Sequence, residues 1–124
     1  MAMLAASIQA LPAFVTRQIR SPAMLFMVVE RFKDQDPLPV YARVEAAGRR
    51  LPPGLTYHAS WVEPNFDRCF QLMECDDATL LQQWVLSWRG SGVSFEIVPV
   101  VPSIATRQTV APFLADAKKK RKKR

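Results

Sequence analysis

The stretch that decides the fold runs from Met24 to Phe32 and reads MLFMVVERF. It is apolar and rich in residues that favour strands, and a Lys-Asp-Gln-Asp-Pro loop follows it, so it is predicted to be a buried strand. Side chains alternate between the two faces of a strand, and both faces of this one are mostly apolar. The strand therefore has to be covered from both sides.

Five further elements follow, alternating between helical and strand patterns. Proline-rich and glycine-rich turns separate them, and the short link Pro64–Asp67 makes the two middle strands an antiparallel hairpin. Apolar residues recur at helical spacing in both helices, and Asp36 and Asp77 or Asp76 are suitable caps. In order, the expected elements are a helix from Asp36–Pro37 to Pro52–Pro53–Gly54, strands over 55–63 and 68–75, a helix ended by Gly90 and Gly92, and a strand over 93–101.

This order predicts an α+β domain over residues 24–101, of the ferredoxin-like β-α-β-β-α-β type. Right-handed crossovers give a four-stranded antiparallel sheet of order 4-1-3-2, with two helices on one face. Pro99 lacks an N–H group, so the last strand is expected at an edge of the sheet or to end its pairing there.

The face without helices predicts a homodimer. Leu25, Met27 and Val29 alternate with Phe26 and Val28 on the first strand, so both faces of the sheet are apolar. An apolar face left in water is typical of an interface. Two copies packed sheet to sheet, as in a dimeric α/β barrel, would shield it, although either end of the chain could cover it instead.

The two ends lie outside this pattern. Residues 1–23 are basic and contain no acidic residue, and we interpret them as a flexible extension, either a presequence or a stretch before the natural start at Met24. Residues 102–124 form a tail with a short helix expected near 110–117. Its last seven residues, Lys118–Arg124, are all basic and should stay solvated because like charges repel.

The net charge of +6 comes from this tail. Elsewhere ten basic residues face 11 acidic ones, so the folded part lacks the basic excess of nucleic-acid binders. Contact with nucleic acid is expected only through Lys118–Arg124. The chain contains no apolar run of about 20 residues that would span a membrane.

Cys69 and Cys75 belong to the same strand, roughly 20 Å apart, which is too far for a disulfide within one chain. We therefore expect a cytoplasmic location. One histidine and two distant cysteines cannot build a metal site of the usual kind, and neither a metal nor another cofactor is predicted.

Three stretches of the chain resemble a family of short bacterial proteins known only as domain of unknown function 3303. They are Met24–Phe32, Arg68–Asp77 and Phe95–Val101. That family is similar to the dimeric α/β-barrel superfamily, so the resemblance implies the fold and the dimer over residues 24–101. It implies no single activity, because that superfamily includes cofactor-independent monooxygenases, haem-degrading enzymes and binding proteins.

Six residues are candidates for lining a ligand pocket. His58 is the only histidine and could act as an acid or a base, although an exposed position on an edge strand is the simpler interpretation. Glu30 and Glu74 are acidic residues in apolar strands, expected about 13 Å apart and therefore not a catalytic pair. Gln71 needs hydrogen-bond partners within an apolar strand. Tyr57 and Trp61 could line a cavity, whereas Trp84 and Trp88 are expected in the core.

These observations leave three hypotheses about function. The first is a homodimer that binds a small molecule or acts as an interaction module. The second is an enzyme resembling the cofactor-independent monooxygenases, with its pocket near His58 and Trp61. The third is a nucleic-acid accessory protein that acts through its basic tail. A deep cavity reached by His58 would favour the second.

Overall fold

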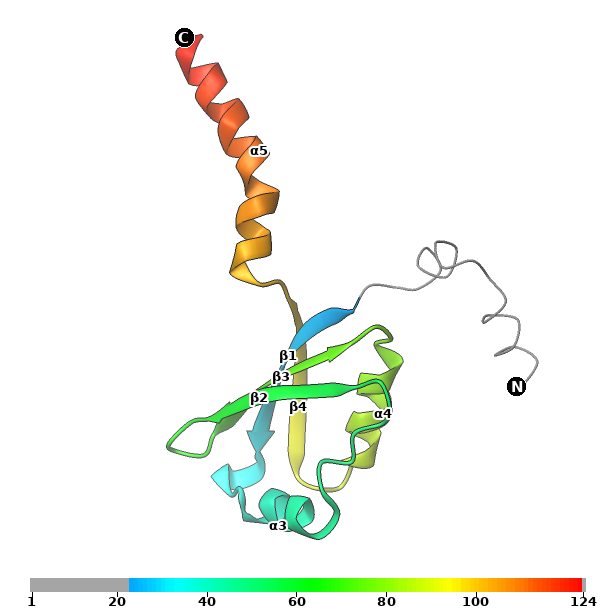
Figure 1. The fold of residues 1–124 in the computed structure, drawn as a ribbon. Helices are drawn as coiled ribbons and strands as arrows, with labels where there is room; N and C mark the ends of the chain where they lie inside the picture. Colours follow the sequence, from blue (N-terminus) through cyan, green and yellow to red (C-terminus); the bar gives the residue numbers. More distant parts are fainter. Residues whose placement is uncertain (1–22, 124) are drawn as a thin grey trace, which may run out of the picture.

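A computed structural model describes residues 23–123 and confirms the predicted order of strands and helices (Figure 1). A short 3-10 helix, η1, connects the first strand to the first α-helix. The elements, labelled as in Figure 1, are β1 (Met24–Phe32), η1 (Lys33–Gln35), α3 (Leu38–Ala47), β2 (Thr56–Val62), β3 (Arg68–Cys75), α4 (Thr79–Ser87), β4 (Val93–Val100) and α5 (Ser103–Lys122). The bounds of β1 and β3 are those that the sequence predicts.

The four strands form one antiparallel sheet in the order β2-β3-β1-β4. This is the predicted order 4-1-3-2 read from the other edge. The two central strands are β1 and β3, and Glu30 pairs with Cys69 between them. Strand β4, which contains Pro99, lies at an edge as expected, because a missing N–H group is tolerated there.

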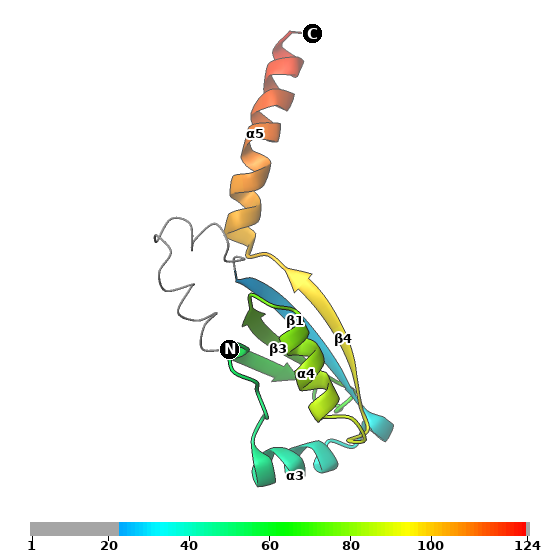
Figure 2. The same ribbon diagram turned by 90° about the vertical axis from the view of Figure 1, so that its right-hand side faces the viewer.

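Helix α4 lies against one face of this sheet, and α3 lies near one end of the sheet, where its Val40 and Val44 pack against the same core (Figure 2). Phe26, Val28 and Met73 point from the sheet into the core on this side, and Leu81 and Trp84 meet them from α4. Burial of each such side chain contributes roughly 1.5–3 kcal/mol. The other face, which we call the open face, has no helix of residues 23–123 packed on it.

Helix α3 is shorter than predicted. The apolar spacing suggested a helix as far as Pro52, but α3 ends at Ala47. Gly48 follows with a φ of 69°, a left-handed conformation that glycine adopts at little cost, and its N–H group donates to the carbonyl of Val44 at 2.7 Å. Glycine, rather than the later prolines, therefore ends this helix, and the loop that follows carries Arg49 toward the sheet.

The tail contains a longer helix than expected. Instead of a short helix near 110–117, α5 spans Ser103–Lys122 and includes Pro112. It extends away from the sheet in both views (Figures 1 and 2). None of its residues is buried. Continuous helix formation through the lysines is favoured at this end, since cations near a helix C-terminus interact well with its dipole.

The expected extension, residues 1–23, lies outside the described residues except for Ala23. Within the part of the chain that the structure describes, no helix has the length and apolarity required to cross a membrane.

Candidate functional site

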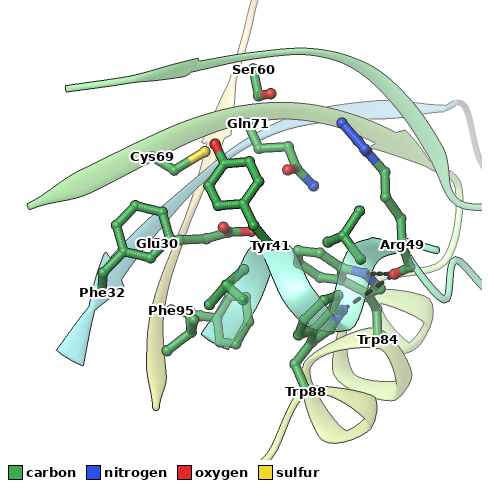
Figure 3. Close-up of a pocket in the computed structure, with 13 residues that line it drawn as sticks. Glu30, Phe32, Tyr41, Arg49, Ser60, Cys69, Gln71, Trp84, Trp88 and Phe95 are labelled. Atoms are coloured by element: carbon green, nitrogen blue, oxygen red, sulfur yellow. Dashed lines mark hydrogen bonds between the residues drawn. The ribbon is translucent and has the colours of Figure 1, made fainter. Parts of the chain in front are cut away.

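A cavity of about 80 Å³ lies between the sheet and helices α3 and α4 (Figure 3). It exceeds the roughly 10–15 Å³ that one water molecule needs, so it has room for a small ligand. Its walls combine aromatic rings with a few polar groups, which is typical of ligand sites. The lining residues are Glu30, Phe32, Val40, Tyr41, Val44, Arg49, Ser60, Cys69, Gln71, Trp84, Trp88, Val93 and Phe95.

The carboxyl group of Glu30 is the most unusual group in this cavity. β1 places Glu30 on the same face as Phe26 and Val28, and the residue is only 7% exposed. Burial raises the pKa of Glu30 to about 7, although the positive charge of Arg49 partly opposes the shift. Glu30 therefore exchanges a proton near neutral pH, which a surface glutamate does not do.

Arg49 provides the positive charge of the cavity. Its guanidinium group stacks on Tyr57, with Cζ 3.8 Å from the ring centroid. Its Nε is buried and has no hydrogen-bond partner in residues 23–123. A buried, unpaired N–H group costs about 1–3 kcal/mol, so this atom favours an acceptor supplied from elsewhere.

The backbone of Arg49 is held firmly. Its carbonyl oxygen accepts hydrogen bonds from the indole N–H groups of Trp84 at 2.9 Å and Trp88 at 3.2 Å (Figure 3). Both tryptophans come from the region of α4 and are almost fully buried. Trp84 also packs edge to face on Phe95, with centroids 5.2 Å apart. Two core tryptophans thus position the loop that carries the cation.

Gln71 and Cys69 complete the polar wall on β3. Gln71 is 6% exposed, and its amide nitrogen donates to the sulfur of Met73 at 3.3 Å, a weak acceptor. No other side-chain hydrogen bond of Gln71 is formed within residues 23–123, so its amide has capacity for a further partner. The pKa of the Cys69 thiol is raised to about 11 by burial and by the charge of Glu30, against the effect of Arg49. Cys69 is consequently a neutral thiol and not a nucleophile near pH 7.

An irregularity in β2 determines which of its side chains reach this site. The register shifts between Tyr57 and Ala59, and His58 is the extra residue. As a result Tyr57 and Ser60 both face the helices, paired with Met73 and Gln71. The Tyr57 hydroxyl lies 2.7 Å from the Ser60 hydroxyl, so Tyr57 supports both Arg49 and Ser60 without lining the cavity itself.

The structure separates the six predicted pocket residues. Glu30 and Gln71 line the cavity, and Tyr57 supports it. His58 lies on the open face, where its Nε2 is 3.4 Å from a Glu74 carboxylate oxygen. Trp61 is 56% exposed and pairs in register with Phe70 on that same face. Glu30 and Glu74 are therefore on opposite faces of the sheet, consistent with the expectation that they are not a pair.

Several residues of the cavity were not singled out by the sequence. Arg49 was placed inside a predicted helix, and no local pattern marked it as part of a site. Trp84 and Trp88 belong to the core as predicted, and they line the cavity as well. The one useful signal was polarity within apolar strands, and it identified Glu30 and Gln71.

Within the described part of the chain, the cysteines and the other metal-binding side chain types form no cluster suited to a metal ion. Cys69 and Cys75 are both free and buried. Among residues 23–123, no group of three His, Cys, Asp or Glu side chains is arranged to hold a metal ion.

Comparison with known families gives one result. The family described as Domain of unknown function (DUF3303) matches residues 24–114, which include all four strands and the first half of α5. No curated protein and no solved structure matches the chain.

Proposed function

The chain belongs to the Domain of unknown function (DUF3303) family, and we propose that it binds a small molecule in the cavity around Glu30. The observation that carries this proposal is a set of buried polar groups whose hydrogen bonds are incomplete. Glu30, Arg49 and Gln71 come from two strands and a loop, and all three line the same aromatic cavity. Buried polar groups are nearly always paired, so the buried Nε of Arg49, which has no partner in residues 23–123, and the amide of Gln71, which is bonded to a weak acceptor, support a missing partner in the cavity.

The walls of the cavity fit a ligand with a flat, apolar body. Tyr41, Trp84, Trp88 and Phe95 offer ring faces and edges, and valines fill the remaining wall. The polar groups gather on the sheet side (Figure 3). A ligand with a ring at one end and a polar group at the other would satisfy both sides of the cavity.

The proposal is tested by comparing ligand binding by the wild type with binding by a variant in which a larger side chain fills the cavity. The full chain is screened against small aromatic fragments by thermal shift and ligand-observed NMR. Val44→Phe adds a ring at the cavity wall, whereas Ala42→Phe adds the same ring on the exposed side of α3. We expect fragments to bind the wild type and Ala42→Phe and to bind Val44→Phe at least tenfold more weakly. Equal binding by all three proteins would contradict the proposal.

We propose further that the fold is ferredoxin-like and that two copies pair through their open faces. The sheet order and the two β-α-β crossovers support the first point. The second is supported by apolar side chains on the open face, including Leu25, Met27 and Leu72, which no helix in the described part of the chain covers. Two unpaired cysteines support a cytoplasmic location.

The enzyme hypothesis has less support. It placed an oxygenase-like pocket near His58 and Trp61, and a cavity reached by His58 was the feature that would favour it. The cavity lies on the other face of the sheet from both residues.

A second candidate function concerns the basic end of α5. Lys118–Lys122 are exposed on a helix that extends from the domain, an arrangement suited to contact with phosphate groups. We expect that replacing Lys118, Lys119 and Lys120 with glutamine weakens retention on an RNA or DNA column, so that the protein elutes at a lower salt concentration. Unchanged retention would contradict this role.

A further inference from the structure

We propose that the molecule held in the Glu30 cavity is a small organic acid, with its carboxylate between Arg49 and a protonated Glu30. This inference rests on the proposed function and names the class of ligand for that same site. It follows from the positions of the charged and polar groups, taken one at a time below.

The first step concerns the space between the two charges. Arg49 is near enough to influence Glu30 electrostatically, yet the ion pairs of residues 23–123 do not include this pair. A guanidinium group whose Nε is buried without a partner in residues 23–123 favours a carboxylate partner. Because Glu30 does not occupy that position, a ligand carboxylate can do so.

The second step concerns hydrogen-bond donors. The buried Nε–H of Arg49 has no acceptor in the described residues, and the amide of Gln71 is bonded only to a sulfur atom. A protonated Glu30 adds an O–H donor. Three residues that line one cavity thus carry N–H or O–H donors, and a carboxylate, whose two oxygens accept about four hydrogen bonds, matches such a set.

The third step concerns the groups that face Glu30. From β3 the neighbour is Cys69, a neutral thiol, and from α3 Tyr41 lines the same cavity (Figure 3). On the β4 side Glu30 pairs with Phe95, and Arg49 comes from the loop after α3. Arg49 is thus the one charged neighbour among these groups, and an anion that pairs with it removes its effect on Glu30. Binding of an acid should therefore raise the pKa of Glu30 further and take up a proton above pH 7.

A cationic ligand is disfavoured for the same reasons. It would need an ionised Glu30 and would lie close to the positive charge of Arg49. It would also leave the donors of Arg49 and Gln71 without acceptors, at a cost for each buried group.

The experiment compares three probes of similar size with different charge. Binding of benzoate, benzamide and benzylamine to the full chain is measured by NMR titration between pH 5.5 and 8.5. We expect benzoate to bind most tightly, with an affinity that falls up to about tenfold per pH unit above pH 7, as Glu30 ionises in the free protein. Benzamide should show a smaller dependence on pH.

Three variants test the assigned roles. Glu30→Gln keeps the shape and a donor but cannot ionise, so benzoate affinity should become independent of pH. Arg49→Met should weaken benzoate at least tenfold and change benzamide much less. Glu74→Gln, on the open face, serves as the control and should bind benzoate as the wild type does.

The outcomes separate this inference from the proposed function. Tightest binding of benzylamine, strengthening above pH 7, would overturn the organic acid and leave the cavity as a binding site. Benzoate binding that Arg49→Met leaves unchanged would also overturn it. If Arg49→Met does not fold, the pH dependence of benzoate affinity in the wild type and in Glu30→Gln provides the test. A dependence that is the same in both proteins would overturn the organic acid. If none of the three probes binds, and if fragments bind Val44→Phe as they bind the wild type or bind neither protein, both the organic acid and the proposed binding site are overturned.

Discussion

The carboxyl group of Glu30 lies between the sheet and the helices, where a charge is costly. Burial explains the high pKa of about 7, and the neutral form is the one that the folded protein prefers in acid. The unfolded chain, in contrast, ionises this group near its ordinary value of 4.5. The difference between the two states makes the stability of the fold depend on pH.

Replacement of Glu30 by glutamine should therefore change stability in a pH-dependent way. In the wild type, the folded state binds more protons than the unfolded state between pH 4.5 and 7, so stability falls as pH rises through this range. The free energy of unfolding of Glu30→Gln, relative to that of the wild type, should therefore rise by up to about 3 kcal/mol between pH 4 and pH 8. Urea unfolding at both pH values measures this gain.

Glu63 offers a control, because its pKa is shifted in the opposite direction to that of Glu30. Two hydrogen bonds from Arg68, at 2.7 and 3.0 Å, lower the pKa of Glu63. Its contribution to stability is present above its ordinary pKa and is lost as pH falls through the lowered value. Glu63→Gln should therefore lose stability relative to the wild type at high pH. The same trend in both variants would contradict the assigned burial of Glu30.

How far single residues could be predicted depends on whether their signal is local. Glu30 and Gln71 are polar residues in apolar strands, and this was visible in the sequence. Arg49 and Ser60 reach the cavity only through tertiary structure. The face that His58 occupies depends on an irregularity in β2, which shifts the alternation of side chains between the two faces by one residue. No residue type in that strand predicted this irregularity.

Helices and strands were predicted more completely than the site, because their patterns extend over many residues. The bounds of β1 and β3 agree with the prediction, and the end of α3 does not, since the apolar spacing continued past Gly48. The length of α5 also exceeded expectation. The helix was expected only near residues 110–117, and the basic run after it was expected to stay solvated. The same basic residues complement the dipole at a helix C-terminus, which favours a helix that continues through them.

Helix α4 holds one wall of the cavity, and its first turn depends on Asp77. The Asp77 side chain accepts hydrogen bonds from the backbone N–H of Thr79 at 2.9 Å and from its hydroxyl at 2.6 Å. Asp77→Ala should therefore lower the free energy of unfolding by about 1 kcal/mol. Asp76→Ala is the matched control and should change it by less than about 0.5 kcal/mol. Equal losses in the two variants would contradict this role of Asp77.

At the scale of the whole molecule, one face of the sheet is packed and the other is open. The packed face holds the cavity, whereas the open face presents apolar side chains from both central strands. A second copy placed on the open face would leave the cavity of each copy unchanged. The two proposals, ligand binding and dimerisation, can therefore be tested separately.

Leu72 lies in the middle of the open face, opposite Met27 in the neighbouring strand. We expect the full chain to sediment as a dimer at micromolar concentration and Leu72→Lys to sediment as a monomer, because a buried lysine without a partner disrupts an interface. Leu86→Lys, on the exposed side of α4, should remain a dimer. A monomeric wild type would contradict the proposed pairing.

The three tryptophans of the chain offer the most direct test of the central claim, because they divide between the two faces. Trp84 and Trp88 line the cavity, and Trp61 lies on the open face. In an NMR titration of the full chain with benzoate at pH 6, the indole N–H signals of Trp84 and Trp88 should shift and saturate together. The Trp61 signal should stay in place. Saturable shifts of Trp61 alone, with Trp84 and Trp88 unchanged, would contradict a ligand site in the Glu30 cavity.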